Sequence, residues 1–201
     1  MSANTDYYNI ESCFTEEQIL IRDATRDWVV KHVKPNIEKY FQKAETPSHL
    51  IKELASIGGF GLIFPEKYGG VNADYISFGL MMQELERGDS SIRVISSIQT
   101  SLVMYAIYKF GSEEQREKYL PKLSTGELLG AFGLTEPDFG SNPSSMHSYY
   151  KEQGDKIIIN GSKMWIGNAE TANIALVWIK DENKVVKGII IETDKITNFT
   201  T

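Results

Sequence analysis

One change in patterning limits what this 201-residue chain can fold into more than any other feature: near residue 128, helical spacing of apolar residues gives way to short strand-like runs. Before that point, apolar residues recur every three or four positions, as on one side of an α-helix. After it, β-branched and aromatic runs are separated by Gly, Asn and Asp, as in strands joined by turns. We therefore predict an α+β chain, with an all-helical domain over residues 1–128 and an antiparallel β domain over residues 129–201.

Two capping boxes mark helix starts in the first part. Residues 15–18 and 112–115 both place a Ser or Thr three positions before a Gln, so that each pair can satisfy the free N–H groups of a first turn. Pro35 interrupts the first helix or begins the next one. The residues after the first box recur near the helical period and predict a buried stripe of Ile19, Ile21, Ala24, Trp28 and Val29.

Prolines and glycines divide the rest of the helical part. A second helix is predicted to start at Pro47 and to end before a glycine-rich loop over residues 59–74. A third is predicted over residues 75–87 and a fourth over residues 92–110. The fourth carries little charge, so we expect it in the middle of the helical domain, where its Ser, Thr and Gln side chains need hydrogen-bond partners.

Turn residues divide the second part into two predicted hairpins. The first joins two short runs at Asn160-Gly161, a dipeptide typical of tight hairpin turns. The second turns over residues 181–184. Such a small sheet leaves an exposed edge strand, and residues 194–201 add at most one further strand. We therefore expect the chain to be cut short within its β domain.

Composition excludes several classes of function. A formal charge of −6 with no cluster of Lys and Arg argues against nucleic acid as the main partner. The single cysteine, Cys13, rules out an internal disulfide and a cysteine zinc cluster, and three dispersed histidines suggest neither a metal site nor a catalytic triad. The start lacks the features of a secretory signal, and no apolar stretch approaches the roughly 20 residues that span a bilayer. We expect a cytoplasmic protein with no membrane span and no metal.

The segment with the most distinctive chemistry is GAFGLTEPDFGSNPSS, residues 130–145. A short apolar run opens into a loop rich in free backbone N–H groups and small hydroxyls. Such a loop can hydrogen-bond the edge of a planar heterocycle and let a pyrophosphate approach the backbone closely. From the residues alone, an ordinary loop between two domains remains the alternative.

Within this segment, AFGLTEPDFGS resembles the flavin-binding signature of the acyl-CoA dehydrogenases, and NGSKMWIGNA resembles the second flavin-contacting segment of that family. The helical part agrees through ELERGDSSIR, the run over residues 101–137 and PSSM. The resemblance covers residues 15–192 and is strongest to the glutaryl-CoA dehydrogenases. It implies an N-terminal helical domain, an incomplete β-barrel-like middle domain over residues 129–201, and a C-terminal helical domain that is absent from this chain.

The resemblance implies FAD as the cofactor and assigns its contacts to two segments. One lies along the flavin ring and its pyrophosphate, and the other covers the opposite side of the ring. Ser141 would also face the thioester arm of the acyl-CoA. The implied cofactor-binding residues are Phe132, Gly133, Leu134, Thr135, Gly140, Ser141, Trp165, Ile166 and Gly167.

Arg93 occupies the position at which glutaryl-type members hold the distal carboxylate of the substrate. The resemblance therefore implies substrate binding by Arg93, Val94 and Ser97, in addition to Ser141. The i, i+4 spacing puts Arg93 and Ser97 on one face of a helix, as a carboxylate clamp requires. An ordinary surface arginine is the alternative.

The sequence departs from the family pattern at two positions of the flavin segments. Gly167 stands where a threonine usually aims its hydroxyl at flavin N5, and some related acyl-CoA oxidases also carry glycine there. Asn142 stands where aspartate usually follows Gly-Ser, and we expect little effect from that change.

The implied activity is α,β-dehydrogenation of glutaryl-CoA, with decarboxylation to crotonyl-CoA and an electron-transfer flavoprotein as the acceptor. The glutamate base belongs to the absent C-terminal domain, Glu136 belongs to the flavin loop, and no residue of this chain is assigned as catalytic. We expect the chain alone not to turn over and to hold FAD weakly if at all. There are two alternatives: an acyl-CoA oxidase, and a non-catalytic protein that is a remnant of a split gene or a subunit pairing with a separate chain. The resemblance also implies a homo-oligomer.

Overall fold

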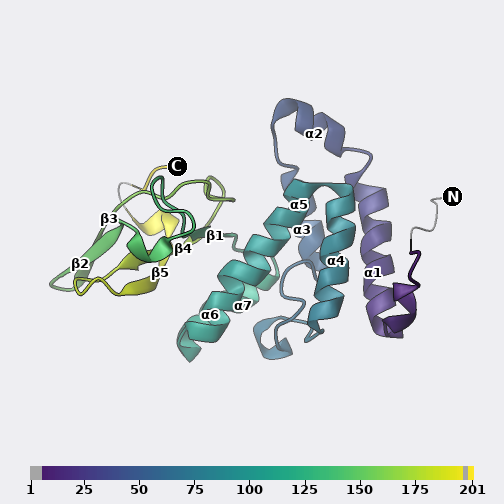
Figure 1. Cartoon of the computed structure of the whole chain (residues 1–201), viewed down its shortest axis with the longest axis horizontal. Helices are drawn as coiled ribbons and strands as arrows, with labels where there is room; N and C mark the ends of the chain where they lie inside the picture. The colour runs from purple at the N-terminus through teal and green to yellow at the C-terminus, as the bar shows by residue number, and fades with distance from the viewer. Residues whose placement is uncertain (1–5, 197–198) are drawn as a thin grey trace. The chain divides into compact units, whose positions relative to one another are not determined.

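The structure is a computed structural model, which describes residues 6–196 and 199–201 (Figure 1). The chain divides into two compact units, Met1–Ser97 and Ile98–Thr201. Helices make up the first unit, and the second contains both helices and all the strands. The predicted α+β order, helices first and strands afterwards, is confirmed.

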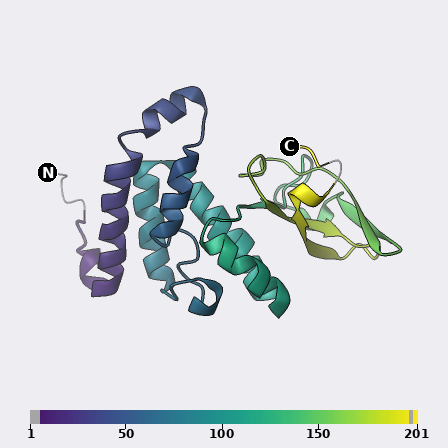
Figure 2. The same ribbon diagram turned by 180° about the vertical axis from the view of Figure 1, so that it is seen from behind.

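The first unit is built around two parallel helices, α1 (Glu16–Trp28) and α4 (Tyr75–Gly88), which lie side by side (Figures 1 and 2). Gln18 Nε2 donates to Asp74 at their first turns, at 2.7 Å, and Arg26 Nη2 donates to Glu84 further along, at 2.8 Å. The other elements of this unit are 3-10 helices Ile10–Cys13 and Glu66–Tyr68, the π-helical turn Val29–Val33, and helices α2 (Ile37–Lys43), α3 (Ser48–Ser56) and α5 (Ser90–Ser97).

The buried face of α1 differs from the predicted stripe. Trp28 and Val29 are buried as expected, but Ile19 and Ile21 are only half-buried and Ala24 is exposed. Polar side chains take their place because each has a partner inside the unit. These buried residues are Gln18, which bonds Asp74, Arg22, which bonds Glu11 and Asp23, and Thr25, which bonds the Ile21 carbonyl.

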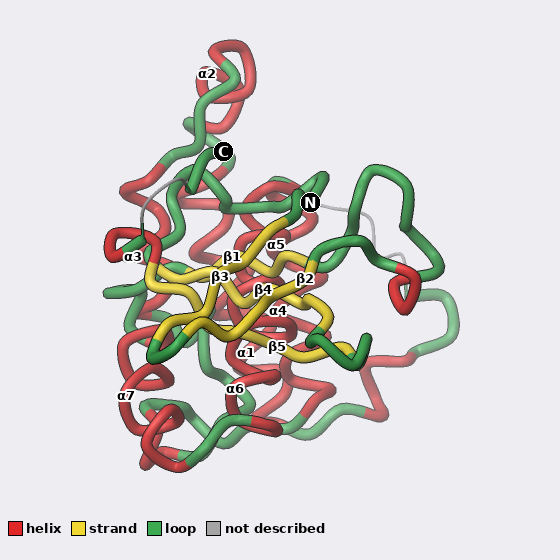
Figure 3. Tube along the Cα trace, turned by 90° about the vertical axis from the view of Figure 1, so that its left-hand side faces the viewer, coloured by secondary structure: helices red, strands yellow, loops and turns green. Residues whose placement is uncertain are grey.

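The second unit begins with the π-helical segment Ile98–Met104, α6 (Tyr105–Phe110) and α7 (Glu113–Ser124), and continues with five strands. The strands are β1 (Gly130–Gly133), β2 (Tyr149–Gln153), β3 (Lys156–Asn160), β4 (Ile174–Lys180) and β5 (Val186–Glu192), drawn in yellow in Figure 3. Two 3-10 turns, Pro143–Ser145 and Thr193–Lys195, complete it. Residues 197–198, within the predicted final strand, lie outside the described residues.

The sheet is mixed and not wholly antiparallel as predicted. Strand β4 runs parallel to β1 and, through the pair Tyr149 and Lys180, parallel to β2, whereas the pairs β2–β3 and β4–β5 are antiparallel. Strands β1 and β4 are separated in the sequence by long loops and the β2–β3 hairpin. Because no tight turn connects them, they are free to pair in parallel. Sequence patterning identified the strands but could not supply this long-range pairing.

The second hairpin turns over residues 181–184 as predicted, but the first does not turn at Asn160-Gly161. Gln153 pairs with Lys156, so the turn lies at Gly154-Asp155, where Gly154 has a φ of 66°. At Gly161, an added Cβ would lie 2.1 Å from Ser148 Oγ. This glycine is therefore required for the close approach of two chain segments, and β3 ends beside it.

Strand β3 forms the exposed edge that the small sheet was expected to leave. All of its residues are exposed, including Ile157, Ile158 and Ile159.

The four predicted helices and both capping boxes are present. The helix predicted over residues 92–110 contains a π-helical segment, in which Gln99 is fully buried. Its Nε2 donates to the Leu123 and Leu128 carbonyls at 2.9 and 2.8 Å, and its Oε1 accepts from Gly130 N at 2.9 Å. Gln99 thus fixes the start of β1. Thr100, also fully buried, is an exception because its hydroxyl has no partner among the described residues.

Among the described residues, no helix is both long enough and apolar enough to cross a membrane.

Candidate functional site

The first of the two predicted flavin segments begins in strand β1. Phe132 and Gly133 point to opposite faces of the sheet, as neighbours in a strand do. The Phe132 ring lies 6.0 Å from the ring of Trp178, whereas Gly133 faces Lys163 and Val177. The chain then leaves the sheet through the half-buried residues Leu134 and Thr135.

The second predicted segment follows β3 and has an unusual backbone. Trp165 and Asn168 have φ values of 61° and 64°, in the left-handed region. Asparagine adopts this region readily, but a bulky aromatic residue there is a genuine outlier, and such outliers cluster at ligand sites. The Trp165 side chain is 85% exposed. Asn168 is held in place because its Nδ2 donates to the Gly130 carbonyl at 3.3 Å.

The structure brings the two segments together. Met164 N donates to the Thr135 carbonyl at 2.8 Å. Lys163 Nζ donates to the Leu134 carbonyl at 3.2 Å and to Glu136 Oε1 at 2.9 Å. Two consecutive residues of one segment therefore bind three consecutive residues of the other, which joins regions separated by nearly 30 positions in the sequence.

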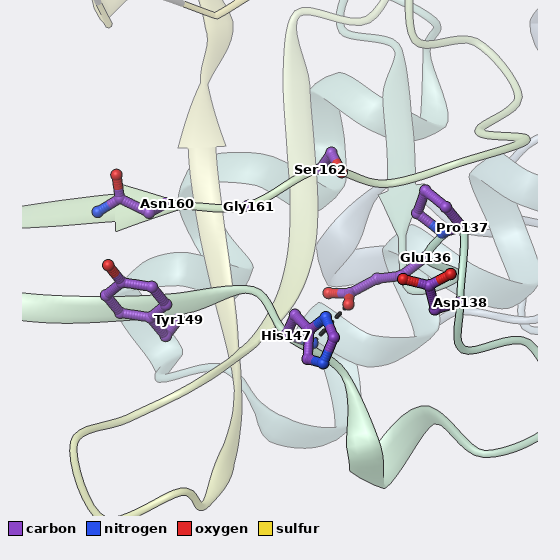
Figure 4. Close-up of a pocket in the computed structure, with 8 residues that line it drawn as sticks. All are labelled: Glu136, Pro137, Asp138, His147, Tyr149, Asn160, Gly161 and Ser162. Carbon is purple, nitrogen blue, oxygen red and sulfur yellow. Dashed lines mark hydrogen bonds between the residues drawn. The ribbon is translucent and has the colours of Figure 1, made fainter.

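Glu136 lies at the centre of this junction and is buried. Its carboxylate also accepts from His147 N at 2.5 Å and from Ser148 N at 2.9 Å; the first of these bonds is dashed in Figure 4. Burial raises the pKa of Glu136, but the hydrogen bonds from Ser148, His147 and Lys163 outweigh it and lower the pKa to about 2. A carboxylate held in this way stays ionised and is a poor proton acceptor at neutral pH.

An open hollow of about 480 Å³ lies beside Glu136 (Figure 4). The His147 ring stands edge-on to Phe139, with 4.6 Å between the ring centroids. This histidine is exposed, and no separate chemical role follows from its position. The hollow is lined by Glu136, Pro137, Asp138, His147, Tyr149, Asn160, Gly161 and Ser162.

The groups that these segments present fit a flavin nucleotide. Gly140 and Ser141 are exposed, and within the described residues their backbone N–H groups donate to no protein acceptor. An added Cβ at Gly140 would meet no atom within 4 Å, so the space beside it is open to a ligand. Free N–H groups suit a pyrophosphate, and the exposed indole of Trp165 can cover an aromatic ring.

Arg93 and Ser97 belong to the first unit and lie on one face of α5, as predicted. Arg93 is half-buried, and its Nη1 donates to Ser97 Oγ at 3.4 Å. Its Nε also donates to Glu86 Oε2, at 2.6 Å. The guanidinium therefore has a carboxylate partner within the chain. Val94 is half-buried, and its carbonyl accepts from Ser97 Oγ at 3.1 Å.

Sequence reasoning missed the residues that hold the two predicted flavin segments together. Lys163 stands inside the recognised motif NGSKMWIGNA, but nothing in its neighbourhood indicates a partner 27 positions earlier. The roles of the His147 and Ser148 amides as donors could not be predicted either, because every non-proline residue carries the same backbone N–H group. The only available signal was the presence of one lysine and one glutamate within two otherwise weakly charged motifs.

Comparison with known proteins identifies the family of this chain. Residues 15–127 match the N-terminal domain of acyl-CoA dehydrogenases, and residues 131–200 match their middle domain. A probable acyl-CoA dehydrogenase of Bacillus subtilis is 35% identical over 90% of this chain and 49% of its own length. A glutaryl-CoA dehydrogenase of Desulfococcus multivorans is 34% identical over 82% of this chain and 43% of its own length.

A solved structure is also similar. The crystal structure of a glutaryl-CoA dehydrogenase from Mycobacterium smegmatis in complex with FADH2 superposes with a TM-score of 0.90, at 40% identity, over 93% of this chain and 48% of that one. The chain thus spans about half the length of the relatives it matches. Because both domain matches together cover nearly all of it, the chain belongs to the acyl-CoA dehydrogenase family of FAD-dependent oxidoreductases.

Proposed function

We propose that the whole protein is an FAD-dependent acyl-CoA dehydrogenase of the glutaryl-CoA type, which removes the α-proton and β-hydride of its substrate and decarboxylates the product to crotonyl-CoA. The observation that carries this proposal is the junction of two flavin-type segments at Lys163 and Glu136. The similarity to a glutaryl-CoA dehydrogenase solved with FADH2 supports it.

The chain's own residues would bind and orient the cofactor. Backbone groups of Phe132–Thr135 would meet the flavin edge, Gly140 and Ser141 the pyrophosphate, and Trp165–Gly167 the other face of the ring. FAD, when bound, supplies the hydride acceptor. No residue of this chain is proposed as the base, since Glu136 is fully engaged in holding the site.

The test of cofactor binding is titration of the purified chain with FAD, followed by the quenching of flavin fluorescence. We expect weak binding that Trp165→Ala weakens further, and no turnover of glutaryl-CoA. Absence of any effect of Trp165→Ala would count against the assigned flavin face. Turnover by the 201-residue chain alone would contradict the assignment of the base to another part of the protein.

For the substrate, we propose that Arg93 binds the distal carboxylate, with Val94 and Ser97 of the same helix as further contacts, and that Ser141 separately contacts the thioester arm of the acyl-CoA. The substrate carboxylate would then replace Glu86 as the partner of the guanidinium. In the whole enzyme, Arg93→Ala should lower the preference in kcat/KM for glutaryl-CoA over butyryl-CoA by about 10- to 100-fold, as expected for a charge-assisted hydrogen bond. Arg116→Ala, which removes a similarly half-buried arginine of α7 that donates to the Tyr108 carbonyl, is the control. An unchanged preference would reject the dicarboxylate assignment.

We also propose the remaining features that family resemblance implies. The functional division lies near residue 128, between domains at 1–128 and 129–201. The family matches to residues 15–127 and 131–200 support this proposal. An electron-transfer flavoprotein accepts the electrons, and the whole protein is a cytoplasmic homo-oligomer.

A second candidate function, acyl-CoA oxidase, follows from Gly167. A glycine carries no hydroxyl to donate beside the flavin, which leaves room for oxygen. Reoxidation of the reduced whole enzyme by oxygen, compared with that of a Gly167→Thr variant, separates the two functions. An oxidase should lose oxygen reactivity in the variant, whereas equal and slow reoxidation of both proteins favours the dehydrogenase.

A further inference from the structure

We propose that Lys163 is a positioning residue for the cofactor site: its buried ammonium group fixes the Trp165 segment against the Thr135 segment and so sets the spacing between the two sets of flavin contacts. The inference rests on the proposed FAD site and deepens it. Lys163 is not proposed to touch the cofactor.

Burial is the first reason to assign this role. The side chains of Lys163 and Glu136 are only 10% and 4% exposed. Lysine and glutamate are almost never buried unless they are paired, because taking a charge out of water is unfavourable. Because this buried pair lies within the two motifs that would contact the flavin, we infer that it holds those motifs in a fixed arrangement.

The geometry of the ammonium group supplies the second reason. Its three N–H donors have three acceptors nearby: Glu136 Oε1 at 2.9 Å, the Leu134 carbonyl at 3.2 Å and Met146 Sδ at 3.7 Å. These acceptors lie at both ends of the loop that contains Gly140 and Ser141. One side chain therefore holds together the start and the end of the proposed pyrophosphate loop.

The attachment also fixes orientation. The next residue, Met164, donates its N–H to the Thr135 carbonyl at 2.8 Å, so the segments are joined at two adjacent points. Two points of attachment restrict sliding and rotation together. Trp165, whose backbone is in the left-handed region, is the next residue after Met164. Loss of the Lys163 contacts should thus let the indole move relative to Thr135 without unfolding the sheet.

Three variants and a control test the proposal in the full chain: Lys163→Met, Glu136→Gln, the double variant Lys163→Met/Glu136→Gln, and Lys187→Met, which changes an exposed lysine of β5. For each, FAD affinity is measured by fluorescence titration and stability by thermal unfolding. Lys163→Met leaves a buried carboxylate without its cation and is destabilised, whereas the double variant removes both charges and recovers stability.

The double variant decides the question. If Lys163 positions the segments, the double variant regains the stability of the wild type but still binds FAD about tenfold or more weakly. A change of about tenfold is typical of coupling between linked sites. If affinity returns together with stability, the pair is merely structural and the proposal is overturned. Lys187→Met should match the wild type in both measurements.

A readout without cofactor separates this proposal from the proposed function. Hydrogen exchange at the amide of Met164 should accelerate at least about tenfold in the double variant, because opening of a local contact controls the exchange of its amide. Amides of the β4–β5 hairpin should not change. If the wild-type chain binds no FAD, the expected weak binding by this chain is contradicted, the proposed function of the whole protein is untouched, and hydrogen exchange alone decides the role of Lys163. Unchanged exchange at Met164 overturns it.

Discussion

Each unit of the molecule contains a buried carboxylate, and the two are held in different ways. In the helical unit, Glu84 is 1% exposed and accepts from Arg26 and Arg87, whose own side chains are 40% and 43% exposed. In the β-containing unit, Glu136 is 4% exposed and its cation, Lys163, is itself buried. The first carboxylate joins α1 to α4, and the second joins two loops.

The difference is between a contact that joins two helices and a contact that joins two loops. The pKa of Glu84 is raised by burial but lowered more by the hydrogen bonds and charges of Arg26 and Arg87, so the net shift is downward. Those arginines can turn towards water if the carboxylate is removed. The Lys163 side chain is itself only 10% exposed, so its removal leaves the Glu136 carboxylate with the His147 and Ser148 amides as donors but without a cation. Four experiments test this difference between the two carboxylates.

The largest effect is expected from Lys163→Met. Removal of the cation from a buried pair should lower the free energy of unfolding by about 3–5 kcal/mol. Urea denaturation, with hydrogen exchange of the β4–β5 amides to identify the unit that opens, measures the loss. Lys187→Met is the control. A loss below about 1 kcal/mol would place this pair with exposed salt bridges and remove the contrast with Glu84.

The next largest expected effect is a loss of folding stability at low pH, caused by protonation of Glu136. Its pKa is about 2 in the folded chain, against an ordinary value of 4.5, so the folded state binds this proton less readily than the unfolded state does. The resulting stability is fully present above pH 4.5 and is lost as the pH falls towards 2, with a total on the order of 3 kcal/mol. Denaturation between pH 6 and 2.5 should show a flatter dependence in Glu136→Gln, and identical curves would refute the linkage.

Glu84→Gln should have a smaller effect, about 1–3 kcal/mol, the usual cost of disrupting hydrogen bonds to charged groups. The half-exposed arginines regain water, which limits the loss. Glu17→Gln, an exposed position in the first turn of α1, is the matched control. A greater loss for Glu84→Gln than for Lys163→Met, in parallel urea titrations, would reverse the comparison.

Lys118→Ala should have the smallest effect. Lys118 is exposed and shares the Glu192 carboxylate with Tyr119 and Lys195, which remain after the substitution. Exposed ion pairs contribute little because water screens them. We expect a melting temperature indistinguishable from that of the Lys187→Met control. A clear decrease would show that the attachment of α7 to β5 depends on this exposed pair.

Local sequence signals predicted that helices precede strands and located several helix starts. Capping boxes, prolines and glycines act locally, so the helices that begin after Thr15 and Ser112 could be located without any knowledge of the fold. The two motifs at 131–141 and 160–169 likewise identified the family, since their chemistry depends on residue types at fixed short spacings.

The tertiary structure alone decided what depends on distant partners. It buried Gln18, Arg22 and Thr25 in α1 in place of a wholly apolar stripe, because each found a hydrogen-bond partner. It made two strand pairings parallel, which no local pattern encodes. It also joined Lys163 to Glu136, because burial and pairing of charges are properties of the folded environment and not of either residue.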